Sequence, residues 1–148
     1  MTIYFASDHA GFELKKHLLS YVQGLGYTAV DKGPFTYDER DDYPDFVRSV
    51  SEEILKDPGN SLGIILGWSG QGEAITVNRF KGIRANVYYG GAPDIVKLAK
   101  EHNNSNILSL GAHFVSVSEA ESAIKTWLET PFSGSERHIR RIEKIDQN

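Results

Sequence analysis

The stretch IYFASDHAG, residues 3–11, joins a short apolar run to a polar turn near the start of the chain. The run is rich in β-branched and aromatic side chains, which favours a buried strand. The turn leads into Leu14, Leu18, Val22 and Leu25, whose spacing is that of one face of a helix. A strand followed at once by a helix is typical of a β-α unit.

Four further apolar runs show the same pattern, and each ends in glycine or a polar turn. They occupy residues 28–30, 62–66, 84–88 and 107–110. Apolar residues with helical spacing lie around 46–54, 95–99 and 120–128, and a last short helix is indicated at 139–145. Ser118 is the candidate N-cap of the helix at 120–128. Strands that alternate with helices predict an α/β fold, with a doubly wound sheet of about five parallel strands and helices on both faces.

The size of the chain fits one domain. Of its 148 residues, 40% are hydrophobic, which is enough for one core and too little for two ordinary domains. No repeat, low-complexity tract or linker interrupts the pattern. We therefore expect a single domain over residues 1–148, with a helical tail from about 131 to 148.

Charge and hydropathy exclude several classes of partner. The 16 Lys and Arg against 20 Asp and Glu give a net charge of −4, which argues against nucleic acid. No apolar run approaches the ~20 residues of a membrane span, and the chain opens without a basic and apolar leader. We expect a soluble cytoplasmic protein with no membrane partner.

The residue types restrict the chemistry. There is no cysteine, so disulfides, thiolate metal sites and cysteine nucleophiles are excluded. The long loop at 32–44 and the start of the next helix are acidic, but the acids lack calcium-loop spacing and no histidine cluster accompanies them. We interpret them as mostly solvated and expect no metal or other cofactor. These acids are Asp38, Glu39, Asp41, Asp42 and Asp45.

The segment GWSGQG, residues 67–72, follows a predicted strand and opens a helix. Its free backbone amides suit an anion, although the same glycines would also make a tight turn without a ligand. A P-loop would need Lys after Gly72, a dinucleotide fingerprint would need glycine at Ile75, and a nucleophile elbow would need glycine at Gln71. Nucleotide binding and serine hydrolysis are therefore disfavoured.

Several polar residues follow the predicted strands or end the helices, and each has two interpretations. Glu73 is either a base beside an oxyanion site or an exposed acid that stabilises a helix N-terminus. Asp8 either binds a sugar hydroxyl or caps a helix, and the pair His102-Asn103 is either functional or a helix C-cap. Arg137 and Arg141, four residues apart, either clamp a phosphate or form a solvated face beside Glu136 and Glu143.

Together these motifs resemble the ribose-5-phosphate isomerase type B family, which includes galactose-6-phosphate isomerase subunits. They occur in the family's order over essentially the whole chain: Ser7–Gly11, Asp42–Pro44, the glycine loop 67–72, Gly82–Ala85, His102-Asn103 and Arg137-His138. The resemblance implies a Rossmann-like fold and aldose-ketose isomerisation of a small phosphorylated sugar through an enediolate. It also implies independence from metal, and homodimers or homotetramers with shared active sites.

The resemblance also implies a role for each candidate residue. Many members carry a cysteine base where this chain has Gly67, but another branch uses a glutamate just after the loop, and Glu73 is similar to that base. The other residues implied to act on the sugar are Ser69, Gly70 and Gly72 in the anion hole, Asp8 and His102 in ring opening, and Asn103 at the enediolate. Those implied to line the sugar and phosphate sites are Tyr43, His9, Arg137, Arg141 and His113.

Two departures from the family pattern bear on the substrate. Trp68 stands where glycine is usual, and His113 stands where the glutamate branch has a phosphate-facing arginine. The indole could shorten the pocket or stack on the sugar. Ribose 5-phosphate and ribulose 5-phosphate are the expected pair. A tetrose, allose or galactose phosphate is the alternative, as is a sugar-phosphate-binding subunit without activity.

Overall fold

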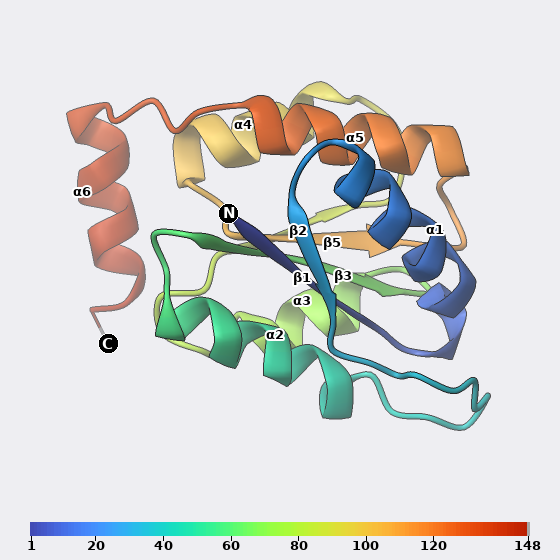
Figure 1. Ribbon diagram of the computed structural model, residues 1–148. Coiled ribbons are helices and arrows are strands. Elements are labelled where there is room, and N and C mark those ends of the chain that lie inside the picture. Colours follow the sequence, from blue (N-terminus) through green and yellow to red (C-terminus); the bar gives the residue numbers. More distant parts are fainter. Residues whose placement is uncertain (148) are drawn as a thin grey trace.

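The computed structural model describes residues 1–147 (Figure 1). Its strands are β1 (Thr2–Ser7), β2 (Thr28–Asp31), β3 (Ser61–Gly67), β4 (Ala85–Tyr88) and β5 (Ile107–Gly111). Its helices are α1 (Phe12–Gly24), α2 (Pro44–Lys56), α3 (Gln71–Val77), α4 (Asp94–Asn103), α5 (Val117–Glu129) and α6 (Glu136–Ile145), with a 3₁₀ turn at His9–Gly11. The strands predicted from the apolar runs are confirmed to within two residues at each end.

The five strands form one parallel sheet in the order β2-β1-β3-β5-β4. The chain runs outward from β1 to β2 and then returns to add β3 on the other side of β1. The order therefore reverses between β1 and β3, and such a switch point places ligands beyond the carboxyl ends of the strands. The predicted doubly wound sheet is confirmed.

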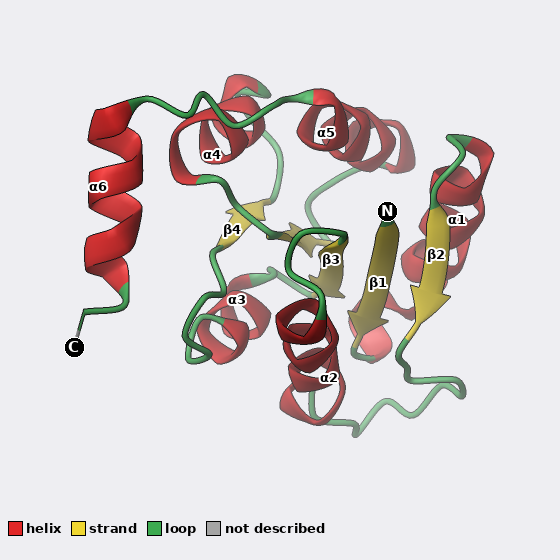
Figure 2. Ribbon diagram, turned by 60° about the vertical axis from the view of Figure 1, so that its left-hand side comes forward, coloured by secondary structure: helices red, strands yellow, loops and turns green. Residues whose placement is uncertain are grey.

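Helices cover both faces of the sheet (Figure 2). Side chains of α1, α4 and α5 form one buried cluster with the sheet, and side chains of α2 and α3 form another. Successive residues of a strand point to opposite faces, so Ile64 lies in the first cluster and Ile65 in the second, and both are fully buried. This burial on both faces explains why β3 is a nearly continuous apolar run.

The N-terminus of α5 differs from the prediction. Its cap is Ser116 and not Ser118, because Ser116 and Glu119 form a reciprocal capping box. The Ser116 hydroxyl accepts a hydrogen bond from the Glu119 amide, and the Glu119 carboxylate accepts one from the Ser116 amide at 2.7 Å. Each serine has a glutamate three residues on, Glu119 after Ser116 and Glu121 after Ser118, but only Glu119 turns back to its serine, because Glu121 is hydrogen-bonded to His17.

A buried lysine fixes the start of the long loop after β2. Lys15 is fully buried and donates to the Asp31 carboxylate at 2.6 Å and to the Pro34 carbonyl at 2.8 Å. The Ser7 amide donates to the Gly33 carbonyl at 3.0 Å. The loop therefore begins against the carboxyl end of β1, beside the switch point.

No helix within residues 1–147 combines the length and the apolar character needed to cross a lipid bilayer.

Candidate active site

Two acids are buried at the carboxyl edge of the sheet, the edge at which β1, β3 and β5 end. Asp8 follows β1 and is 7% exposed, and its Oδ1 accepts the amides of Ala10 and Gly11 at 2.9 and 3.2 Å. The capping interpretation of Asp8 is therefore confirmed, and it leaves Oδ2 for other partners. Burial raises the pKa of the Asp8 carboxyl, and the two amide hydrogen bonds oppose that rise.

Glu73 lies in the first turn of α3 and is only 3% exposed, so the interpretation as an exposed helix-terminus acid is wrong. Its carboxylate rests against the backbone of Gly67, and a Cβ added at Gly67 would overlap it. Burial raises the pKa of Glu73, its own backbone amide lowers it, and the charge of Asp8 raises it further. A buried carboxylate with a raised pKa is a stronger proton acceptor than a solvated one.

The glycine loop between β3 and α3 holds a strained turn. Gly70 has φ of +75°, a left-handed conformation that other residues avoid, and its carbonyl accepts the Ser109 hydroxyl at 2.6 Å. Gly72 lies under Tyr43, since a Cβ added at Gly72 would sit 2.6 Å from the Tyr43 hydroxyl. The loop thus brings Tyr43 next to Gly72, which the family resemblance places in the anion hole with Ser69 and Gly70.

Trp68 and His113 form a stacked pair at the same edge. Their ring centroids are 3.7 Å apart with an interplanar angle of 13°, and the His113 amide donates to the Trp68 carbonyl at 3.1 Å. Both side chains are exposed. The two departures from the family pattern are therefore one structural unit at the rim of the loop.

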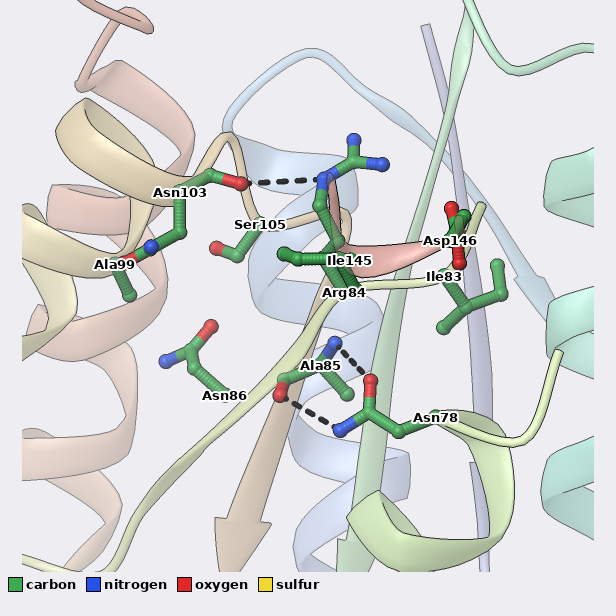
Figure 3. A pocket seen from close by; sticks show the side chains of 10 residues that line it. All are labelled: Asn78, Ile83, Arg84, Ala85, Asn86, Ala99, Asn103, Ser105, Ile145 and Asp146. Carbon is green, nitrogen blue, oxygen red and sulfur yellow. Dashed lines mark hydrogen bonds between the residues drawn. The ribbon is translucent and has the colours of Figure 1, made fainter. Parts of the chain in front are cut away.

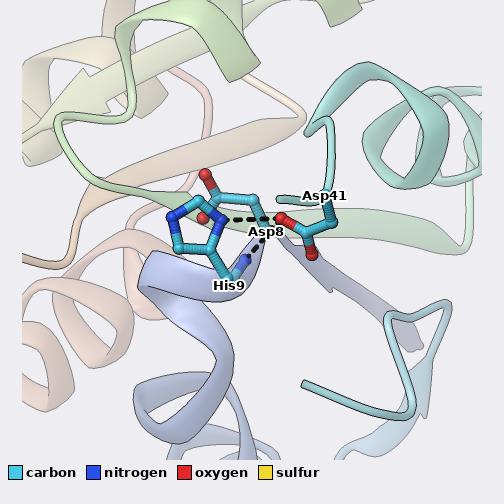
Figure 4. Close-up of side chains that lie close together, drawn as sticks. All are labelled: Asp8, His9 and Asp41. Carbon is cyan, nitrogen blue, oxygen red and sulfur yellow. Dashed lines mark hydrogen bonds and ion pairs between the residues drawn. The ribbon is translucent and has the colours of Figure 1, made fainter. Parts of the chain in front are cut away.

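His9 is held by a residue that the sequence analysis did not select. The Asp41 Oδ1 accepts both the His9 backbone amide at 3.0 Å and the His9 Nδ1 at 2.7 Å (Figure 4). The Asp41 side chain is only 6% exposed, so the interpretation of this acid as solvated is wrong. Within residues 1–147, Asp8, His9 and Asp41 are the one group whose ligand atoms lie close enough to hold a metal. His9 and Asp41 lie close together because they are hydrogen-bonded, and Asp8 is near them because it precedes His9 in the chain.

The remaining candidates gather at the opposite, amino edge of the sheet, from which β5 starts. The rings of His102 and His138 are 4.4 Å apart, and the Arg137 Nε donates to the His138 Nε2 at 3.2 Å. Burial lowers the pKa of His138, and the charges of His102, Arg137 and Arg141 lower it further. Neither arginine is in an ion pair within residues 1–147, so the alternative interpretation, a solvated face paired with Glu136 and Glu143, finds no ion pair there.

The candidate residues therefore form two clusters. The carboxyl-edge cluster contains Asp8, His9, Tyr43, Ser69, Gly70, Gly72, Glu73 and His113, and the amino-edge cluster contains His102, Asn103, Arg137, His138 and Arg141. The five residues of β5 separate the two edges, at about 3.3 Å per residue, by roughly 15 Å. Figure 1 shows the separation, with α6 at the left and the arrowhead of β5 directed to the right. A single copy of the chain therefore holds the two clusters at opposite edges of its sheet.

A cavity of about 360 Å³ lies at the amino edge between β4, α4 and the end of α6 (Figure 3). Asn103 lines it, and the Arg84 Nε donates to the Asn103 carbonyl at 3.1 Å. Both polar atoms of the Asn86 amide are buried without a partner within residues 1–147. Asn78 exchanges two hydrogen bonds with the backbone of Ala85 and so satisfies the amide and the carbonyl of the first residue of β4. The buried acids of the carboxyl edge are not among the lining residues.

Comparison with known proteins assigns the family. The model of the Ribose/Galactose Isomerase family matches residues 3–145, nearly the whole chain. The chain belongs to the ribose/galactose isomerase family. The resemblance seen in the sequence motifs is confirmed.

Ribose/galactose isomerases of known structure share the fold in detail. The chain is similar to ribose-5-phosphate isomerase B of Mycoplasma genitalium with bound ribulose-5-phosphate, with a TM-score of 0.93 and 36% identity over 99% of this chain and 94% of that one. The structure of a ribose 5-phosphate isomerase from Thermotoga maritima matches with a TM-score of 0.91 and 41% identity, covering 99% and 98% of the two chains. Ribose-5-phosphate isomerase B of Mycolicibacterium paratuberculosis is 39% identical over 97% of this chain and 88% of its own length.

The sequence of this ribose/galactose isomerase did not predict the contacts of two polar residues, Asp41 and His138. Asp41 is one of several loop acids, and nothing in its local pattern separates it from its exposed neighbours. His138 was noted in the pair Arg137-His138, but without a role. The signal that could have found it is its position next to Arg137, whose guanidinium can donate a hydrogen bond to a neutral histidine ring.

Proposed function

We propose that this protein interconverts ribose 5-phosphate and ribulose 5-phosphate. The observation that carries the proposal is the likeness over nearly the whole chain to the Mycoplasma genitalium enzyme with bound ribulose-5-phosphate. A buried carboxylate of raised pKa beside a glycine loop at the switch point supports the same chemistry, because isomerisation needs one base and donors for a developing oxyanion. We further propose that the enzyme acts in the cytoplasm, since a phosphorylated sugar does not cross an apolar bilayer unaided.

The proposed reaction proceeds through an enediolate. Asp8 and His102 open the sugar ring by moving a proton between the ring oxygen and the C1 hydroxyl. Glu73 takes the proton from C2 of the open aldose, the hydroxyl proton on O2 passes to O1, and Glu73 returns its proton to C1, which gives the ketose. Amides of the glycine loop at Ser69, Gly70 and Gly72 stabilise the negative charge on oxygen, assisted by Asn103. His9, Arg137, Arg141 and His113 are proposed to hold the phosphate, and Tyr43 to line the sugar.

We propose that each site takes its amino-edge cluster from a second copy of the chain, in a homodimer or homotetramer. The separation of the two clusters supports this, since the proposed roles require them around one substrate. The surface near β4 supports it too. Both α3 and α4 pack on β4, and Ile75, Ile95 and Leu98 there are 60%, 52% and 40% exposed. Ile95, Leu98 and His102 share one face of α4, so covering that face would carry His102 into the partner's site.

Replacement of Arg141 by Ala should raise KM strongly, by about tenfold or more, because a guanidinium makes charge-assisted hydrogen bonds to a phosphate. Steady-state kinetics over a range of ribose 5-phosphate concentrations measures the change. Arg140→Ala is the matched control, since Arg140 is an exposed neighbour on α6 to which no role is assigned. Equal KM values for Arg141→Ala and the parent would mean that this arginine is merely solvated.

Activity should persist in EDTA and after treatment with thiol-modifying reagents. The proposed enediolate route uses no metal, and the chain has no cysteine to modify. Turnover is measured before and after dialysis against EDTA. Loss of turnover that added divalent metal restores would replace the enediolate route with a metal-assisted hydride shift.

The stack of Trp68 on His113 bears on the choice of sugar. A panel of pentose, tetrose, allose and galactose phosphates, assayed for turnover and for binding, tests the proposed substrate directly. The highest kcat/KM is expected with ribose 5-phosphate. A higher kcat/KM with another sugar phosphate would show that ribose 5-phosphate is not the preferred substrate. Binding without turnover across the panel would indicate a subunit that has lost activity.

A further inference from the structure

We propose that Asp41 is a positioning residue, which holds the imidazole of His9 in one orientation, with Nδ1 on the carboxylate and Nε2–H of the protonated ring free to donate to the substrate phosphate. The proposal deepens the proposed function, because it depends on the phosphate-binding role of His9. It adds to the site a carboxylate from the long loop after β2, a segment that otherwise contributes only Tyr43 to the proposed site.

The contacts of Asp41 are those of a support for His9. One oxygen, Oδ1, accepts from both the backbone amide and the ring Nδ1 of His9, so the two groups are fixed relative to each other. The Asp41 side chain is 6% exposed, although Asp38, Glu39 and Arg40 beside it are exposed. The loop therefore turns this one acid inward toward the carboxyl edge.

The hydrogen bond determines what His9 presents to a ligand. If Nδ1 donates to a carboxylate, the Nδ1–H tautomer is favoured in the neutral ring, and Nε2 is left for other partners. Figure 4 shows the second ring nitrogen on the side of the ring away from Asp41. The His9 side chain is 34% exposed, which leaves that nitrogen within reach of a bound molecule.

The charges around His9 act in the same direction. The hydrogen bond to Asp41 raises the pKa of His9, burial opposes this, and the charges of Asp8, Asp41 and Glu39 raise the pKa further. Tyr37, whose ring meets the His9 ring edge-on at 6.4 Å, is the other titratable group against it. A raised pKa keeps the imidazole cationic to higher pH, and a cation is what a phosphate dianion needs.

The test compares Asp41→Asn with Glu39→Gln. Each variant removes one negative charge near His9, but only the first removes the charge from the hydrogen bond. We expect Asp41→Asn to raise KM for ribose 5-phosphate by about tenfold at neutral pH with little change in kcat, and Glu39→Gln to stay close to the parent. The alkaline rise of KM should begin at a lower pH in Asp41→Asn, because His9 then loses its proton earlier.

Nitrogen NMR of the His9 ring provides a second measurement that needs no variant. In the parent, the ring should carry its neutral-state proton on Nδ1 and titrate above the ordinary histidine value. An Nε2–H tautomer, or a normal or lowered pKa, would overturn the proposal even if Asp41→Asn failed to fold. Kinetics of Asp41→Asn indistinguishable from those of the parent would overturn it as well.

The two measurements separate this proposal from the proposed function. If the parent fails to turn over any sugar phosphate, the function is wrong, whatever the state of the His9 ring. If the parent is active while the His9 ring shows neither the tautomer nor the raised pKa, only the role of Asp41 is wrong.

Discussion

Glu73→Gln should lower kcat by about 10²- to 10⁴-fold, the usual loss when a general base is removed. Glutamine retains the size of the side chain and can still donate and accept hydrogen bonds beside Gly67, but it cannot accept the proton from C2. KM should change little, because Glu73 is not among the groups proposed to hold the phosphate. Turnover of ribose 5-phosphate and exchange of its C2 proton with deuterium from solvent are the two measurements.

A comparison of Tm tests whether Glu73→Gln folds as the parent does. Because burial raises the folded pKa of Glu73, its ionised form destabilises the fold, and this penalty grows as pH rises from the unfolded value through the folded one. Glutamine removes the penalty, so Tm of the variant at neutral pH should equal or exceed that of the parent. The difference in Tm should vanish in acid, where Glu73 is protonated in both states. A variant that keeps more than about a tenth of parental kcat would contradict the assignment of the base.

The pH dependence of the parent follows from the same shift. The base must be ionised to accept a proton, so kcat/KM should fall as pH drops through the raised pKa of Glu73. The acid limb should therefore lie at a higher pH than a solvated glutamate would give. An acid limb at the ordinary glutamate value would mean that the pocket does not shift the base.

Mixing two inactive variants should restore activity if the site is shared. Glu73→Gln damages the carboxyl-edge cluster, and the double change Arg137→Ala with Arg141→Ala damages the amino-edge cluster. A heterodimer of the two has one site with all defects and one site with none. After random exchange of subunits, about a quarter of all sites should be intact, a large gain over either variant alone. Co-expression or joint refolding provides the exchange, and kcat/KM per site is measured with substrate well below KM, where both the lost base and the weakened phosphate binding lower the rate.

The matched control pairs Glu73→Gln with Asp8→Asn. Both changes lie in the carboxyl-edge cluster, so every site of their heterodimer carries one of them and no recovery is expected. Recovery with the first pair alone supports a site built from two chains. If neither pair recovers although heterodimers form, each chain carries a complete site and the proposed sharing is wrong.

The fold could be predicted because its signals are local. Five apolar runs of strand length, separated by stretches with helical spacing, leave few alternatives to a doubly wound sheet. The location of the motifs that follow β1 and β3 could also be predicted, because segments that follow neighbouring parallel strands lie at the same edge of a sheet. The start of α5 was misplaced by two residues because Ser116 and Ser118 are both acceptable caps, and the choice depends on a side chain contact of Glu119.

The environments of single side chains could not be predicted in the same way. Glu73 reads as a helix-terminus acid in sequence, and its burial depends on the space left by Gly67 and on the packing of α3 against β3. Asp41 is one acid in an acidic loop, and its inward turn depends on contacts with a histidine 32 residues away in sequence. Periodicity carries no information about either contact, since the first depends on the conformation of the turn between β3 and α3, and the second joins the segments that follow β1 and β2.

The close approach of Gly67 and Glu73 restricts how the proposed carboxylate base could be replaced by a thiol base at position 67. A side chain at position 67 and the carboxylate of Glu73 would occupy one volume, so a thiol base at 67 and this carboxylate base exclude each other. Gly67→Cys alone would push the carboxylate aside, and loss of Glu73 alone would remove the proposed base. Changing one base for the other therefore takes two coupled substitutions, with a poor catalyst as either intermediate. The glycine that looks like a simple loop residue thus determines which acid-base chemistry the chain can use.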